Sequence, residues 1–307
     1  MQPGHELTFH DGTCCKCGSS EDLIRFSEFG KALCPDCFPE FVRRRIEGTL
    51  RRFRMIPKGA HAAVAVSGGS DSGALLHALA RTRARLNFSL SAVHIDMGLG
   101  EYSRRSLQVA RQQCAGANVT LHDDAVARHG VQIAPLGRWP VCAVCGAVRR
   151  ALLPRLARRI GADVLCMGHT LDDQLQFMMK NILSGHAISP APVLPATSYA
   201  PAKVKPLIQV PDQATDTYVR LVGIPTVAEP CPRFVPDSHR FKDVFELLEQ
   251  HAPMGKLQFW RVLRKVMRPA DEGDDAGHLC SVCGEPTSMP VCTICRLRQA
   301  QQEDAQH

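Results

Sequence analysis

The 307-residue sequence contains no long uncharged apolar run. A segment such as Ala60–Val66 is far too short to cross a bilayer, which needs about 20 apolar residues. Residues 1–10 also lack the basic stretch followed by an apolar stretch that marks a secretory signal. These two absences argue against a membrane protein and against a secreted one. They predict a cytoplasmic protein with no membrane among its partners.

Cysteine, by contrast, is abundant, with 14 residues. In a reducing compartment such a number indicates metal ligands or redox groups rather than disulfides. Ten of the cysteines form five CxxC pairs: Cys14/Cys17, Cys34/Cys37, Cys142/Cys145, Cys280/Cys283 and Cys292/Cys295. The two pairs near each end of the chain make a four-cysteine set suited to tetrahedral zinc. The sequence therefore predicts two Zn²⁺ ions, one in each terminal module.

Between these modules, short apolar runs alternate with helical patterns, which is typical of a parallel, doubly wound α/β sheet. The spacing predicts buried strands over 62–66, 90–95 and 163–167, a short strand over 119–122 and an extended segment over 204–210. It predicts helices over 41–56, 73–84, 103–115, 148–160, 171–183, 212–222 and 241–266, the last with a break at 253–255.

A glycine-rich turn, SGGSDS, lies between the first buried strand and its helix. Its backbone N–H groups and the helix start suit phosphate oxygens, and its serines add hydroxyl donors. A Walker A lysine is missing, which excludes a P-loop kinase or GTPase pattern. Asp71 fits Mg²⁺ better than phosphate. The predicted nucleotide-contacting residues here are Ala65, Val66, Ser67, Gly68, Gly69, Ser70, Asp71 and Ser72.

SGGSDS resembles the pyrophosphate loop of the N-type ATP pyrophosphatases, which split ATP between the α and β phosphates. The stretch GHTLDD, which begins at Gly168, resembles a motif of the tRNA-modifying branch, with Asn181 placed as in that branch. The resemblance implies that Asp172 is a catalytic or metal-binding carboxylate and that Gly168 and His169 lie near the nucleotide. The segment VHID resembles the family's second strand and places His94 and Asp96 over the adenosine.

The internal pair Cys142/Cys145 matches a CxxCG motif of the tRNA thiolation branch, where a distant third cysteine joins it. Cys231 stands at the matching position. Three thiolates can hold a [4Fe-4S] cluster and leave one iron open for the sulfide to be delivered. Persulfide transfer through the same cysteines, or a zinc site completed by another residue, are the alternatives. Arg149 and Ser70 stand where relatives commonly have lysine, and Arg149 is expected to contact the phosphates of ATP.

Terminal zinc ribbons around a pyrophosphate-loop core are similar to the TtuA-type tRNA 2-thiouridine synthetases and to the cytoplasmic tRNA 2-thiolation proteins. The implied domains are a zinc module (1–40), a basic helical linker (41–57), a catalytic domain (58–245), a helical extension and linker (246–275), and a second zinc module with its tail (276–307).

The expected activity is tRNA sulfur transfer, in which ATP adenylates the 2-oxygen of a uridine and sulfur then replaces that oxygen. The net charge of +7 and the arginine clusters at 43–54 and 149–159 suit a tRNA backbone. The resemblance further implies a ubiquitin-like thiocarboxylate carrier as sulfur donor and a homodimer. The alternatives are a lysidine-type ligase or another amide-forming enzyme on the same core, and a non-catalytic RNA-binding protein.

Overall fold

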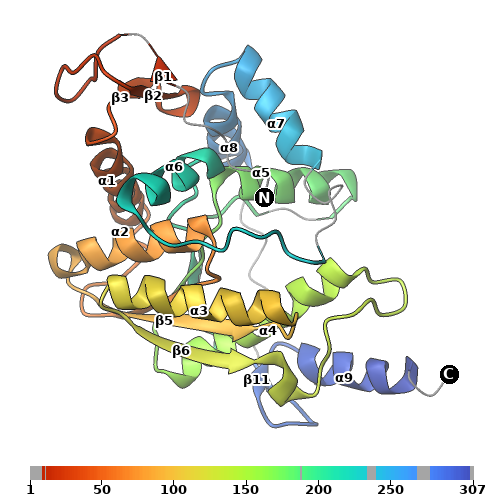
Figure 1. The fold of residues 1–307 in the computed structure, drawn as a ribbon. Helices are drawn as coiled ribbons and strands as arrows, with labels where there is room; N and C mark the ends of the chain where they lie inside the picture. Colours follow the sequence, from red (N-terminus) through yellow and green to blue (C-terminus); the bar gives the residue numbers. More distant parts are fainter. Residues whose placement is uncertain (1–8, 11, 187–188, 234–239, 268–276, 305–307) are drawn as a thin grey trace.

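The computed structural model describes residues 9–10, 12–186, 189–233, 240–267 and 277–304 (Figure 1). Its centre is a six-stranded sheet in the order β6-β5-β4-β7-β9-β8. The first five of these strands are parallel, and β8 pairs antiparallel with β9. The strands are β4 (His61–Ala65), β5 (Ser89–Asp96), β6 (Thr120–Ala125), β7 (Val164–Cys166), β8 (Val193–Leu194) and β9 (Ala202–Val204). The predicted fold class is confirmed.

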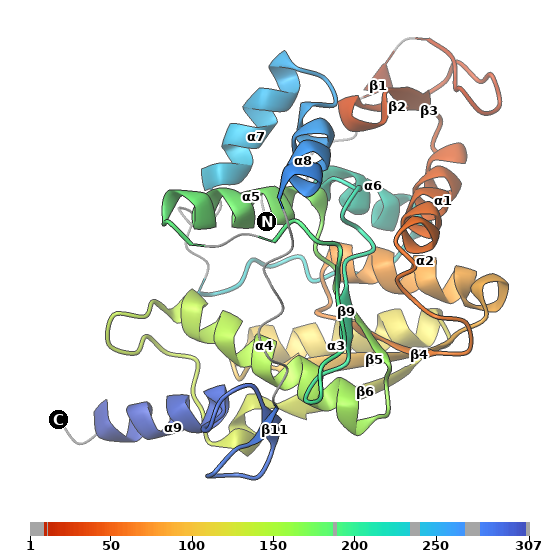
Figure 2. The same ribbon diagram turned by 180° about the vertical axis from the view of Figure 1, so that it is seen from behind.

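Helices cover both faces of this sheet, as Figures 1 and 2 show from opposite sides. They are α1 (Cys37–Arg52), α2 (Ser70–Leu86), α3 (Glu101–Gly116), α4 (Val141–Arg159), α5 (Leu171–Leu183), α6 (Asp212–Val222), α7 (Arg240–His251), α8 (Gly255–Val266) and α9 (Thr293–Asp304). Helix α4 packs against β5, β6 and β7 on one face, with α9 beyond it. Helices α1, α2 and α6 pack together on the other face.

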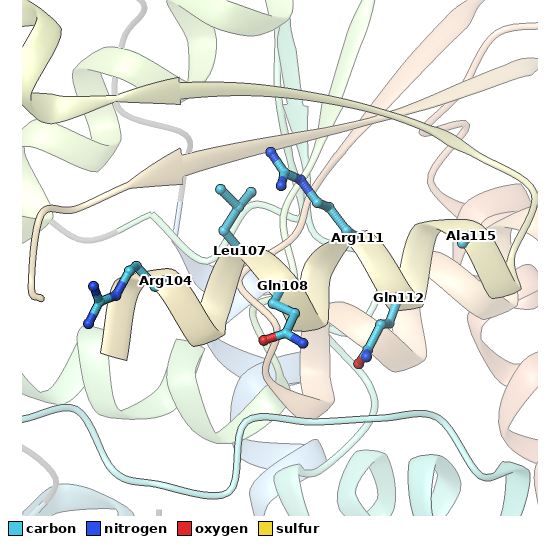
Figure 3. Close-up of a pocket in the computed structure, with 6 residues that line it drawn as sticks. All are labelled: Arg104, Leu107, Gln108, Arg111, Gln112 and Ala115. Carbon is cyan, nitrogen blue, oxygen red and sulfur yellow. The ribbon is translucent and has the colours of Figure 1, made fainter. Parts of the chain in front are cut away.

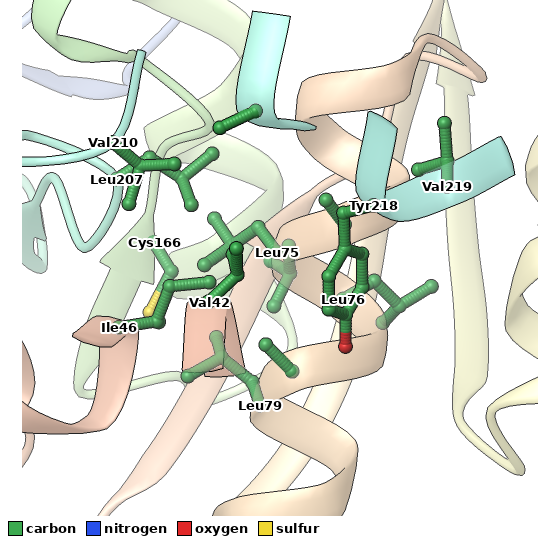
Figure 4. Close-up of a cluster of buried hydrophobic side chains, with 14 of the residues drawn as sticks. Val42, Ile46, Leu75, Leu76, Leu79, Cys166, Leu207, Val210, Tyr218 and Val219 are labelled. Atoms are coloured by element: carbon green, nitrogen blue, oxygen red, sulfur yellow. The ribbon is translucent and has the colours of Figure 1, made fainter. Parts of the chain in front are cut away.

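Strand alternation divides the interior into two cores. Ala62 and Val64 of β4 point into the core beneath α1, α2 and α6, where Leu75 and Tyr218 also lie (Figure 4). Ala63, between them in sequence, points into the core beneath α4. Successive residues of a strand face opposite sides, so a strand buried on both faces is apolar throughout. A third cluster joins α5, α7 and α8.

The two terminal modules extend these cores. The N-terminal four-cysteine module (Cys14–Cys37) contains β2 (Leu23–Phe26), β3 (Lys31–Leu33) and the 3₁₀ turn η1 (Ser27–Phe29), and β2 also pairs with β1 (Phe9–His10). It joins the core beneath α2. The C-terminal four-cysteine module (Cys280–Cys295) contains β11 (Pro286–Thr287) paired with β10 (His278–Leu279), and it joins the core beneath α4. Neither module is large enough to bury a core of its own.

The helices over 171–183 and 212–222 begin and end at the predicted residues. Helix α4 starts at Val141, seven residues earlier than the predicted 148, so the CxxC pair lies inside its first turns rather than before it. The two-residue strand β8 lies outside every predicted strand. Part of the predicted 246–275 linker, residues 268–275, lies outside the described ranges. No helix within those ranges is both long and apolar enough to span a bilayer.

Replacing Leu75 by alanine tests the main core. The side chain is fully buried under the sheet, so Leu75→Ala should lower the free energy of unfolding by about 2–5 kcal/mol. Leu183→Ala is the matched control, because that leucine is 66% exposed. Urea denaturation of both variants, followed by circular dichroism, measures the difference. Equal losses for the two variants would contradict the assignment of the core.

Candidate functional site

The two predicted motifs meet at the carboxyl ends of neighbouring strands. The chain runs from β4 to β5 and β6 on one side, then returns through α4 to β7 on the other side of β4. Such a reversal of strand order opens a crevice in which α/β proteins bind ligands. The pyrophosphate loop follows β4, and the GHTLDD segment follows β7. A methyl group added at Gly168 would lie 3.3 Å from the Ser72 backbone, so the two segments are in direct contact.

Hydrogen bonds to the loop's own serine hydroxyl groups stabilise its conformation. The Ser67 N–H donates to the Ser72 hydroxyl at 3.1 Å, and the Ser72 hydroxyl lies 3.2 Å from the Gly69 carbonyl. Helix α2 starts at Ser70 with Gly69 as its N-cap, and no side chain caps it. The N–H groups of its first turn have no partner within the helix and carry its positive dipole end. An anion is the natural partner for this turn.

Two other segments fix the loop from outside. The Ser106 hydroxyl of α3 donates to the Ser67 carbonyl at 2.6 Å, and the Val227 N–H donates to the Gly68 carbonyl at 2.9 Å. Gly68 has φ +79°, and a Cβ there would lie 2.9 Å from the Ser106 carbonyl oxygen. Glycine is therefore required at this position both by conformation and by space.

Three carboxylates gather beside the loop. Oxygens of Asp71, Asp173 and Asp212 all lie within 4.8 Å of one another. Burial raises the pKa of Asp71 well above its usual range, and the charges of Asp212 and Asp173 add to the shift. The Lys242 ammonium pairs with Asp173 at 2.7 Å and with Asp212 at 2.5 Å, and the Thr215 hydroxyl donates to Asp71. Oxygens at this spacing fit a Mg²⁺ ion, whose ligands lie about 2.0–2.1 Å from the metal.

Asp172 is not part of this group. One of its oxygens accepts the Asp212 N–H at 2.8 Å and the other accepts the Lys256 ammonium at 2.9 Å. Its neighbour Asp173 is both a member of the carboxylate group and the capping partner of Thr170 at the start of α5. The side chain of His169 is exposed to solvent. Asp173 therefore stands nearer to Asp71 than Asp172 does, although the resemblance implies the metal-binding role for Asp172.

His94, near the end of β5, has one ring nitrogen with no hydrogen-bond partner among the described residues. Its Nδ1 lies 2.8 Å from the Val66 carbonyl, which can only accept, so Nδ1 carries the proton. Burial lowers the pKa of His94 and keeps the ring neutral. The buried Nε2 has no hydrogen-bond partner among the described residues and so offers a lone pair. Asp96 is half-buried and accepts the Gly98 N–H at 2.8 Å within a turn.

The three internal cysteines come from two segments that contact each other, and their shared role as cluster ligands stays a prediction. The Cys142 thiol donates to the Arg233 carbonyl at 3.6 Å, which brings the loop that carries Cys231 against the start of α4. Burial raises the pKa of the Cys145 thiol, the Arg149 guanidinium opposes that shift, and the nearby Cys231 and Cys142 thiols add to it. The three sulfurs do not all lie within 4.8 Å of one another, as the ligands of a single metal ion would. No fourth cysteine joins these three among the described residues; tetrahedral zinc needs four ligands, whereas three thiolates can hold a [4Fe-4S] cluster.

Several residues at this site carry no signal in the sequence. Tyr102 lies beside the thiols: burial raises its phenol pKa, and the charges of Cys231 and Cys145 add to the shift. Helix α6 contributes Asp212 to the carboxylate group and Thr215 as a partner of Asp71. Helix α7 contributes Lys242, which pairs with Asp212. An acid in the first turn of a helix is so common that Asp212 could not have been singled out.

Each terminal set of four cysteines has the geometry of a tetrahedral metal site. All four sulfurs of Cys14, Cys17, Cys34 and Cys37 lie within 4.8 Å of one another, as do those of Cys280, Cys283, Cys292 and Cys295. The Cys17 and Cys34 sulfurs are 3.6 Å apart, and those of Cys283 and Cys292 are 3.7 Å apart. Tetrahedral zinc with bonds of about 2.3 Å places sulfurs about 3.8 Å apart. Cys15 is exposed and outside the first set.

A cavity of about 830 Å³ opens beside the thiols. Its walls come from the turn after β5, the segment after β6, and Pro232 and Arg233 next to Cys231. A second hollow, about 490 Å³, lies on the outer face of α3 and is lined by Arg104, Leu107, Gln108, Arg111, Gln112 and Ala115 (Figure 3). The first cavity adjoins the candidate site through Arg233, whose carbonyl accepts the Cys142 thiol.

Many of the clustered arginines pair within the protein. Arg43 contacts Glu40 and Glu47, and Arg159 contacts Asp124. Arg45 donates to the Gln209 carbonyl at 2.8 Å and stacks on Phe29. These contacts stabilise the fold and reduce the charge available to a polyanion. Arg149 and Arg150 are exposed on α4, so that part of the predicted basic surface remains accessible.

Known proteins resemble this chain both in sequence and in fold. Residues 42–230 match the family model described as the PP-loop domain. The chain is 31% identical to the tRNA-5-methyluridine(54) 2-sulfurtransferase of Thermotoga maritima, over 93% of this chain and 96% of that protein. It is 30% identical to cytoplasmic tRNA 2-thiolation protein 1 of Mus musculus, over 93% of this chain and 71% of that protein. A solved structure, the U34-tRNA thiolase NcsA from Methanococcus maripaludis with its [4Fe-4S] cluster, superposes with a TM-score of 0.76 at 22% identity, covering 94% of this chain and 95% of that one.

Replacing Gly68 tests the pyrophosphate loop. Gly68→Ala should abolish measurable binding of an ATP analogue, because the new Cβ must move the Ser106 backbone or distort the loop. Gly59→Ala is the matched control, since Gly59 has the same φ of +79° but nothing within 4 Å of a Cβ. Both variants carry a strain of about 1–3 kcal/mol, and only the first alters the loop. Calorimetric titration with the analogue separates them, and normal binding by Gly68→Ala would contradict the assignment.

Proposed function

Because this chain belongs to the PP-loop domain family, we propose that it is a tRNA 2-thiolation enzyme. The proposed reaction adenylates the 2-oxygen of a uridine with ATP and then replaces that oxygen with sulfur. The contact between the Cys142 thiol and the loop carrying Cys231, close to Arg149, is the observation on which this proposal chiefly rests. Similarity to proteins named tRNA 2-sulfurtransferase and tRNA 2-thiolation protein supports it.

In the first half-reaction the uridine oxygen attacks the α-phosphorus, the bond to the bridging β-phosphate oxygen breaks, and pyrophosphate leaves. Backbone N–H groups of residues 68–72 and the Arg149 guanidinium would bind the departing phosphates. Asp71, Asp173 and Asp212 would hold Mg²⁺, which offsets the charge that develops on pyrophosphate. Lys242 adds one fixed positive charge to the same group. His94 Nε2 would accept a hydrogen bond from the bound nucleotide.

In the second half-reaction a sulfur nucleophile attacks C2 of the base, and AMP leaves with the original oxygen. A [4Fe-4S] cluster would supply that sulfur when bound. Cys142, Cys145 and Cys231 would hold it. The 830 Å³ cavity, whose wall includes Pro232 and Arg233 next to Cys231, would admit a base turned out of its stack.

The terminal modules would each bind one structural Zn²⁺ ion and hold the two ends of the chain against the core. We further propose a cytoplasmic location, a homodimer and a ubiquitin-like thiocarboxylate carrier as sulfur donor. The location follows that of the mouse relative, which is named a cytoplasmic protein. The other two follow from the resemblance of the motifs to the thiolation family.

Iron content tests the sulfur site. Protein purified without oxygen should contain about four iron atoms per chain and show the broad visible absorbance of a cluster. Cys231→Ala should lose the iron, whereas Cys114→Ala should keep it, because Cys114 is buried in α3 away from the three thiols. Iron-free protein that still thiolates tRNA through persulfide chemistry would contradict the proposed cluster but not the proposed reaction.

Loss of a tRNA modification tests the reaction itself. Mass spectrometry of tRNA nucleosides from a strain lacking this protein should show that one 2-thio nucleoside has disappeared. Return of the wild-type gene should restore it, and the Asp71→Asn variant should not, because that change removes a carboxylate from the proposed magnesium site. An unchanged nucleoside profile would contradict thiolation and favour a lysidine-type or amide-forming activity on the same core.

A further inference from the structure

A buried lysine joins three parts of the molecule that are distant in sequence. The Lys256 side chain is 1% exposed, and its ammonium lies 2.7 Å from Glu28, 2.9 Å from Asp172 and 2.6 Å from Glu246. Moving an unpaired ammonium out of water costs several kcal/mol. The charge is tolerated at this place because the three carboxylates surround it.

The three carboxylates come from different elements. Glu28 belongs to the turn η1 of the N-terminal four-cysteine module, Asp172 to the first turn of α5, and Glu246 to α7. Glu249 fixes the backbone that carries the lysine, because its oxygens accept the N–H groups of Met254 at 2.5 Å and Lys256 at 2.9 Å. The ammonium therefore has little freedom to leave its partners.

The contact continues from Asp172 to the carboxylate group beside the pyrophosphate loop. The second oxygen of Asp172 accepts the Asp212 N–H at 2.8 Å. The Thr170 hydroxyl donates to the Asp212 carboxylate, and an oxygen of Asp212 lies within 4.8 Å of oxygens of Asp71 and Asp173. The placement of Asp212 thus depends on Asp172, and that of Asp172 on Lys256.

We propose that Lys256 is a positioning residue of the magnesium–ATP site and that it couples this site to the N-terminal four-cysteine module through Glu28. The inference rests on the proposed function in that it takes Mg²⁺ and ATP as the ligands. The C-terminal module has a different attachment: Glu285 pairs with Arg158 of α4 at 2.6 Å. Loss of the N-terminal module's contact should therefore weaken nucleotide binding, and loss of the C-terminal module's contact should not.

The test measures binding of the ATP analogue with a methylene bridge between its α and β phosphates, in the presence of Mg²⁺, to the full-length, zinc-replete protein. Lys256→Gln should weaken binding about 10- to 100-fold, as outer-shell changes around metal sites do. Glu28→Gln should weaken it about threefold or more, although Glu28 belongs to another module. The Mg²⁺ concentration for half-maximal binding should rise in both variants.

Glu47→Gln is the matched control. Glu47 is also a buried acid on the N-terminal side, paired with Arg43, Arg51 and Arg85, but it has no contact with Lys256. It should lower the unfolding midpoint while leaving the dissociation constant within about twofold. Glu285→Gln, which loosens the C-terminal module, should also leave nucleotide binding unchanged.

Folded Lys256→Gln protein with wild-type affinity for the analogue and for Mg²⁺ would overturn the inference. If Lys256→Gln fails to fold, Glu28→Gln provides the test. An affinity of Glu28→Gln for the analogue equal to that of Glu47→Gln would then overturn the inference. Failure of the wild-type protein to bind the analogue would instead contradict the proposed function. Normal wild-type binding together with unaffected variants would remove only the role of Lys256.

Discussion

The pairing of β4 with β7 is the constraint on which the site depends. Their register aligns Val64 with Cys166, so both strands end at the same level of the sheet. The loop after one strand then meets the loop after the other, and Gly168 touches the backbone of Ser72. A Cβ at 168 would require the Ser72 backbone to move by a few tenths of an ångström, next to Asp71. The absence of side chains at Gly68 and Gly168 thus matters as much as the presence of the carboxylates.

The two terminal modules meet the same physical need on opposite faces of the sheet. Each is too short to form a core of its own, so each adds its cysteines and a few apolar side chains to a core of the central domain. A metal ion would fix the backbone of each module, and the shared core would fix the module to the domain. Their polar attachments then differ, with Glu28 directed to Lys256 near the carboxylates and Glu285 to Arg158 on α4.

Much of this arrangement could be predicted because its signals are local. The helix over 171–183 has an amphipathic pattern and a capping box formed by Thr170 and Asp173. Both its helical periodicity and its first residue are therefore predictable from the sequence. Strand β8 was missed because it has two residues and forms only as the edge partner of β9. The roles of Lys242 and Lys256 could not be predicted. On a helix of mixed charge a lysine is ordinarily a solvated residue, and only tertiary contact distinguishes these two.

Helix α4 relates the two halves of the proposed chemistry to each other. Its first two turns carry Cys142 and Cys145, and Arg149 stands four residues after Cys145, on the same side of the helix and about 6 Å further along its axis. The guanidinium proposed to bind phosphate and the thiols proposed to serve sulfur delivery are thereby fixed on one rigid element. Adenylation attaches the base oxygen to the α-phosphate, so C2 of the base stays within a few bonds of the phosphate that Arg149 would hold. The base would therefore need to move little between its activation and the attack by sulfur, and the reactive intermediate would not have to leave the crevice.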